Sequence, residues 1–61
     1  MRDDIQLREI ADKGYSRFEV AIYHLRVTED ECRRLLELCE GEPIASSIRA
    51  GMQRYGFSLT E

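Results

Sequence analysis

Residues 16–41 have the sequence SRFEVAIYHLRVTEDECRRLLELCEG, and this stretch decides the fold. Within it, residues 28–31, TEDE, have the form of a capping box, in which the hydroxyl of Thr28 and the carboxylate of Glu31 each satisfy a free backbone N–H at a helix start. The acids also suit the positive end of the helix dipole. We therefore predict a helix over residues 29–40, which a glycine ends and whose inward face consists of Cys32, Leu35, Leu36 and Cys39.

The segment before this helix admits two interpretations. Residues 16–19, SRFE, repeat the capping-box pattern, and a helix over 17–25 would bury one apolar stripe that consists of Phe18, Ala21, Ile22 and Leu25. The same run is rich in β-branched and aromatic residues and alternates as a strand does, with Phe18, Val20 and Ile22 on one side. We favour the helix because the capping box and the complete stripe agree, whereas the alternation breaks at His24.

A helix on the N-terminal side fits residues 4–13. Asp3 or Asp4 can cap it, and Gly14 follows where a left-handed residue is favoured. Its apolar residues are Ile5, Leu7, Ile10 and Ala11.

On the C-terminal side, Pro43 suits the first turn of a last helix, and Gly56 ends that helix. Its apolar stripe consists of Ile44, Ile48, Met52 and Tyr55. The fold class that we predict is therefore all-α: a bundle of four short helices that forms one domain over residues 1–61.

The length and composition suit a small folded domain. A chain of 61 residues with 43% hydrophobic and 34% charged side chains can form a core, but a domain of this size hides only about 60% of its unfolded surface. We therefore expect self-association, as a homodimer. There is no apolar run of the ~18 residues that a membrane span needs, and residues 1–4, MRDD, lack the apolar stretch of a signal peptide. We expect a cytoplasmic protein that does not contact a membrane.

Catalytic and metal-binding patterns are missing from the sequence. His24 is the only histidine, and no Cys-x-x-Cys pair stands beside it, so we predict no zinc site. Cys32 and Cys39 would lie roughly 10 Å apart on one helix, too far for a disulfide, and we expect them to be buried apolar side chains. Ser46 and Ser47 have no predicted base. We therefore expect no enzymatic activity, no cofactor and no small-molecule substrate.

Residues 7–36, LREIADKGYSRFEVAIYHLRVTEDECRRLL, resemble the helix-turn-helix segment of small bacterial and phage regulators. Residues 11–16, ADKGYS, are similar to the A-x-x-G-h-S entry into the first motif helix, and residues 25–28, LRVT, to the L-G-V-S turn. The resemblance implies that the helix over 29–40 is the recognition helix, with Cys32 and Leu35 at its buried positions.

The chain departs from the family pattern in three ways. Arg26 stands where the turn has glycine, the preceding helix is one residue longer than usual, and the recognition helix begins with the three acids at 29–31. A duplex carries one charge per ~1.7 Å and would repel those acids. Capped helices joined by short turns also occur in small bundles that do not bind DNA. A weaker resemblance is to ribbon-helix-helix proteins, with a strand over 17–27 that pairs in a dimer and enters the major groove.

Two functional hypotheses follow from these patterns. The resemblance implies a regulator of transcription that binds duplex DNA or a component of the transcription machinery. The alternative is an acidic adaptor or inhibitor that engages a basic protein surface, which the net charge of -3 favours. Its acidic face would consist of Asp3, Asp4, Glu29, Asp30 and Glu31. The candidate contact residues overall are Arg26, Glu29, Asp30, Glu31, Arg33, Arg34, Arg49 and Arg54, of which Arg49 and Arg54 are the only charged residues between positions 43 and 60.

Overall fold

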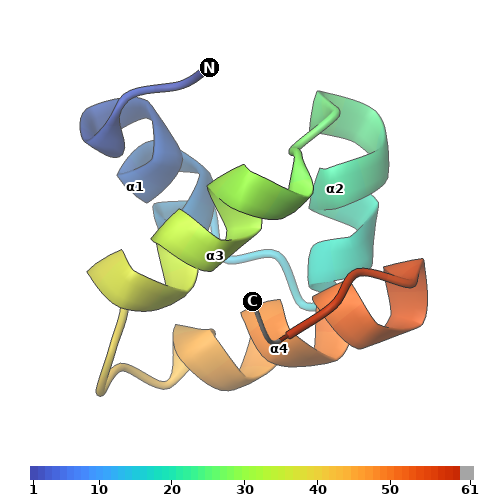
Figure 1. Cartoon of the computed structure of the whole chain (residues 1–61). Coiled ribbons are helices and arrows are strands. Elements are labelled where there is room, and N and C mark those ends of the chain that lie inside the picture. The colour runs from blue at the N-terminus through green and yellow to red at the C-terminus, as the bar shows by residue number, and fades with distance from the viewer. Residues whose placement is uncertain (60–61) are drawn as a thin grey trace.

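Residues 1–59, the part of the chain that the computed structural model describes, contain four helices joined by short loops. They are α1 (Asp4–Asp12), α2 (Phe18–Leu25), α3 (Glu29–Leu38) and α4 (Ile44–Tyr55). α3 crosses the front of the molecule with α1 and α2 on either side, and α4 lies beneath them (Figure 1). α1 and α4 both pack on α3, and α2 packs on α4. The all-α prediction is confirmed, and the alternative of a strand over 17–27 is wrong.

Local hydrogen bonds explain where α1 and α3 begin. The Thr28 hydroxyl accepts from the Glu31 N–H at 3.1 Å, and the Glu31 carboxylate accepts from the Thr28 N–H at 2.9 Å, so the predicted capping box is confirmed. Asp3 caps α1 in the same way with Gln6, at 2.8 and 3.0 Å. Both starts therefore follow from side chains three residues apart in the sequence.

The predicted capping box at Ser16 is wrong. The N-cap of α2 is Arg17, which makes no side-chain capping bond, so the third residue beyond the cap is Val20 instead of Glu19. The Glu19 carboxylate instead accepts from the Arg17 guanidinium at 3.0 Å. The hydroxyl of Ser16 stands one residue too early to cap a helix that begins at Phe18, whose side chain is fully buried.

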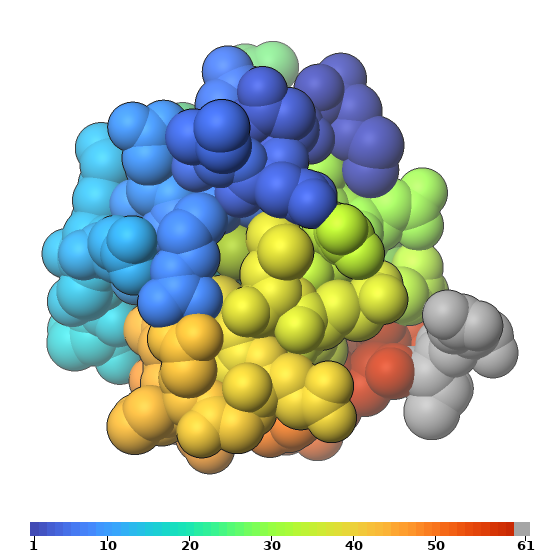
Figure 2. Space-filling model, turned by 90° about the vertical axis from the view of Figure 1, so that its left-hand side faces the viewer, coloured from blue at the N-terminus to red at the C-terminus, as the bar shows by residue number. Residues whose placement is uncertain are grey.

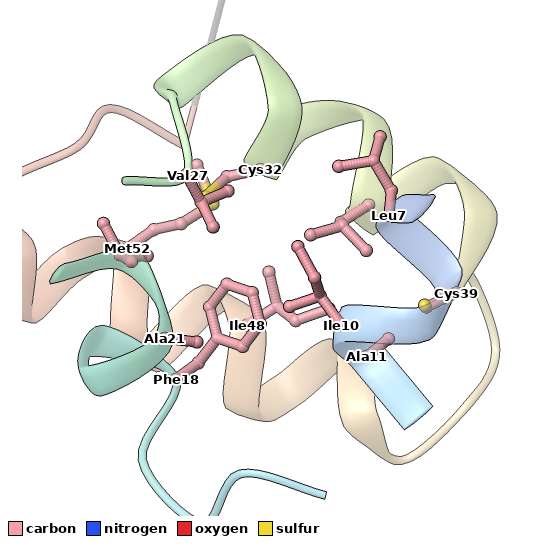
Figure 3. Packing of buried hydrophobic residues seen from close by; sticks show 12 residues of the cluster. Leu7, Ile10, Ala11, Phe18, Ala21, Val27, Cys32, Cys39, Ile48 and Met52 are labelled. Carbon is pink, nitrogen blue, oxygen red and sulfur yellow. The ribbon is translucent and has the colours of Figure 1, made fainter. Parts of the chain in front are cut away.

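The core is shared by all four helices (Figure 3). It contains both cysteines, which are free, and burial raises the pKa of the Cys32 thiol to about 12. Two apolar residues of the predicted helices do not face inward: Ile5 is 75% exposed, and Tyr55, which we placed in the apolar stripe of the last helix, is 44% exposed. Ile5 lies two positions before Leu7 and therefore on the opposite side of α1. The core residues are Leu7, Ile10, Ala11, Phe18, Ala21, Ile22, Val27, Cys32, Leu35, Cys39, Ile48 and Met52.

Gly51 is where α2 and α4 approach most closely. A Cβ atom at this position would lie 2.7 Å from the backbone nitrogen of Glu19 and 2.7 Å from the Cβ of Phe18. Gly51 is in the middle of α4 and is buried. The helix tolerates this poor helix former because any side chain would force the two helices apart.

Candidate macromolecule-binding surface

The connection between α2 and α3 is three residues long, and each residue has a distinct role. Arg26 adopts φ 52° and ψ 46°, and it is the one non-glycine residue with positive φ among residues 1–59. Val27 is buried and its N–H donates to the Ile22 carbonyl at 3.2 Å. Thr28 then caps α3. The left-handed residue thus stands at the position where the turn of helix-turn-helix regulators has glycine, at a cost of roughly 1–2 kcal/mol for a side chain with a Cβ.

The exposed side of α3 is a network of ion pairs. Arg33 pairs with Asp30 at 2.9 Å and with Glu29 at 3.4 Å. Arg34 pairs with Asp4 of α1 at 2.7 Å and with Glu37 at 3.7 Å. We call these six side chains the α3 face. The face has four carboxylates and two guanidinium groups, so it carries two excess negative charges. Hydrogen bonds from Arg34 lower the pKa of Asp4.

Glu31 does not belong to the exposed acidic surface. We predicted that it faces solvent with its two neighbours, and this is wrong, because Glu31 is only 2% exposed. Its carboxylate points back to the start of α3, where it accepts from the backbone of Thr28 and from Arg2. The capping box turns the side chain inward. Glu29 and Asp30 remain as the exposed carboxylates of the first turn, with side chains 39% and 78% exposed.

The basic residues predicted outside α3 do not gather into one patch. Arg49 of α4 and Arg26 are exposed and form no ion pair with another residue of the described part. Arg54 lies 3.8 Å from the Glu19 carboxylate. The end of α2, next to Arg26, and the middle of α4 lie at opposite ends of the molecule (Figure 1).

Residues 1–59 contain no group of three side chains that could hold a metal ion, and they form no pocket. His24 is exposed and stacks edge-on against Tyr23, with ring centroids 5.3 Å apart. No helix in this part of the chain is long and apolar enough to cross a membrane. The exposed apolar side chains are Met1, Ile5, Val20, Tyr23 and Tyr55.

No protein-family model, curated protein or solved structure matches the chain.

Proposed function

We propose that the chain is a small non-enzymatic regulator of transcription that binds a component of the transcription machinery through the α3 face. The observation that carries this proposal is the α2–α3 connection. The left-handed Arg26, the buried Val27 and the capping Thr28 support the resemblance to helix-turn-helix regulators, in which such a connection presents the second helix to a macromolecule.

The charges of the α3 face favour a protein target over a duplex. Asp30, the most exposed residue of the first turn, would meet the phosphates if α3 entered a groove, and the face as a whole is negative. Arg33 and Arg34 would have to leave their carboxylate partners to reach a phosphate. A basic protein surface is complementary to the same face, and electrostatic complementarity of this kind accelerates association.

Binding to purified bacterial RNA polymerase tests the proposal. Asp30→Gln should weaken binding several-fold, mainly through slower association, because one exposed charge is removed from the contact surface. The control is Glu40→Gln, an exposed carboxylate beyond the end of α3 that forms no ion pair in the described part. Thr28 still caps α3 in the Asp30→Gln variant. Lack of polymerase binding, or equal effects of the two substitutions, would contradict the proposal.

Direct binding of duplex DNA is the second candidate, because Arg26 and Arg49, although they form no common patch, are each an exposed cation without an ion pair among residues 1–59. Exposed ion pairs contribute little to stability, so those of the α3 face can open. A double variant with Glu29→Gln and Asp30→Gln distinguishes the two candidates, because the change in binding affinity should have opposite directions for the two targets. It should strengthen binding to a duplex and weaken binding to a basic protein surface.

The homodimer stays a prediction. The exposed apolar side chains that such a dimer could cover are those of Ile5 on α1, Val20 and Tyr23 on α2, and Tyr55 on α4. A midpoint of thermal unfolding that rises with protein concentration would support a dimer, and a constant midpoint would contradict it.

A further inference from the structure

The first residues of the chain lie against the start of α3, where the dark blue N-terminal residues in Figure 2 meet its yellow-green first turns. Arg2 is the centre of this contact. Its backbone N–H donates to one Glu31 carboxylate oxygen at 2.8 Å, and its Nη1 donates to the other at 3.0 Å. Its Nη2 donates to the backbone carbonyl of Leu25. Arg2 thus binds a group on each side of the α2–α3 connection, the Leu25 carbonyl at the end of α2 and the Glu31 carboxylate in the first turn of α3.

Arg2 supplies each of its two acceptors with a donor that α2 and α3 do not provide. Leu25 is the last residue of α2, so its carbonyl has no N–H four residues ahead within the helix. Glu31 is a buried carboxylate, and a buried charge requires a partner of opposite sign. Burial raises the pKa of Glu31, but the hydrogen bonds from Thr28 and Arg2 and the charge of Arg2 outweigh burial and lower it. Glu31 is therefore ionised at neutral pH, and its buried negative charge depends on Arg2 for a counter-charge.

We infer that Arg2 is a positioning residue that fixes α3 relative to α2, and that α3 presents its face to a partner only while this contact holds. Two guanidinium nitrogens reach two acceptors on different helices, which fixes the distance between the Leu25 carbonyl and the Glu31 carboxylate. A lysine carries its three donor hydrogens on one nitrogen and lacks the two separate, coplanar nitrogens with which Arg2 reaches the two acceptors. The dependence of partner binding on Arg2 rests on the proposed function, whereas the positioning itself does not.

Amide hydrogen exchange in Arg2→Ala tests the positioning without any partner. Loss of Arg2 leaves the Glu31 carboxylate buried without a counter-charge, so the carboxylate should turn to solvent and release the Thr28 N–H. We expect exchange at Thr28 to accelerate about tenfold or more relative to the wild type. Exchange at Phe57, whose N–H donates to Met52 at 2.8 Å, is the internal control and should change much less. Arg17→Ala removes an exposed arginine with a local ion pair and should leave the Thr28 rate unchanged.

Arg2→Lys separates positioning from charge alone. The positioning role predicts that this substitution does not keep the wild-type exchange rate at Thr28, because the ammonium cannot replace the fork of two guanidinium nitrogens. A wild-type rate in Arg2→Lys would overturn it, as would an unchanged rate in Arg2→Ala. If Arg2→Ala does not fold, Glu31→Gln replaces it, since glutamine keeps an oxygen that can accept from Thr28 but loses the charge. Introducing Arg2→Lys into the Glu31→Gln protein should then change the exchange rate at Thr28 much less than Arg2→Lys changes it in the wild type. Equal changes in the two backgrounds would overturn the inference.

RNA polymerase binding by the folded Arg2→Lys variant tests the functional part. We expect a loss of affinity of about tenfold, against no loss for Arg17→Ala. Faster exchange at Thr28 with unchanged polymerase affinity would overturn the functional role of Arg2. If the wild type itself does not bind polymerase, the proposed function fails, and the exchange data still decide whether Arg2 positions α3.

Discussion

Gly51→Ala is the substitution for which helix propensity and packing predict opposite results. Alanine is the better helix former by about 1 kcal/mol, so in an isolated α4 the change would stabilise the helix. In the folded chain the new Cβ would lie 2.7 Å from Glu19 N, 2.7 Å from Phe18 Cβ and 2.9 Å from Phe18 C. Carbon atoms pack at about 3.5–4.0 Å, so α2 and α4 must separate by about 1 Å.

The net cost follows from these two terms. Overpacking of a core costs about 1–3 kcal/mol, and the upper end applies here because two of the three clashing atoms are backbone atoms that cannot rotate away. Subtracting the propensity gain leaves a loss of about 2 kcal/mol in the free energy of unfolding. Domains have about 0.05–0.15 kcal/mol of stability per residue, so the loss is a large part of the total for a chain of 61 residues.

Urea denaturation followed by far-UV circular dichroism measures this loss. Gln53→Ala is the matched control, because Gln53 lies two residues away on the same helix and is exposed. It should change the free energy of unfolding by less than about 0.5 kcal/mol. A Gly51→Ala protein as stable as the wild type, or more stable, would refute the close contact between α2 and α4.

Three further substitutions or conditions test the structure. Leu35→Ala should lower the free energy of unfolding by about 2–5 kcal/mol, because Leu35 is fully buried; a melting temperature near that of the wild type would contradict its central place in the core. Arg26→Gly should raise the free energy of unfolding by about 0.5–1 kcal/mol, since glycine removes the cost of positive φ but adds chain entropy; urea denaturation that shows a loss would contradict the left-handed turn. The folded-state pKa of Glu31 is below its ordinary value of 4.5, so its contribution to stability is present above pH 4.5 and is lost as pH falls through the folded pKa. Urea denaturation between about pH 6 and pH 3 should show this loss in the wild type and a smaller loss in Glu31→Gln.

The boundaries of the helices follow from local sequence to a large extent. The capping box at Thr28 and the aspartate at position 3 are patterns within four residues, and each is present in the structure. The prediction at Ser16 failed by one residue, because the N-cap of α2 is Arg17 and the residue three positions after it is Val20, whose side chain cannot accept a hydrogen bond and close the box. Leu36 and Ile44, which the apolar spacing also placed inward, are only partly buried and pack against the edge of the core.

The α3 face could be predicted only in part. The pairs of Arg33 with Glu29 and Asp30 join residues three and four positions apart on one helix, so spacing alone indicates them. The pair between Arg34 and Asp4 joins residues thirty positions apart and depends on how α1 packs on α3. Glu31 was misplaced although the signal was present, because the third residue of a capping box directs its carboxylate to the backbone and cannot also present it to a partner.

The choice between a protein and a duplex as the target is tested most directly by titrating the wild-type chain against random-sequence duplex DNA at low salt. RNA polymerase is titrated in the same buffer. The negative α3 face predicts saturable binding to the polymerase and none to the duplex. Duplex binding that weakens by orders of magnitude between about 50 and 200 mM salt, without polymerase binding, would contradict a protein target and move the contact away from the α3 face, to Arg26 or to Arg49.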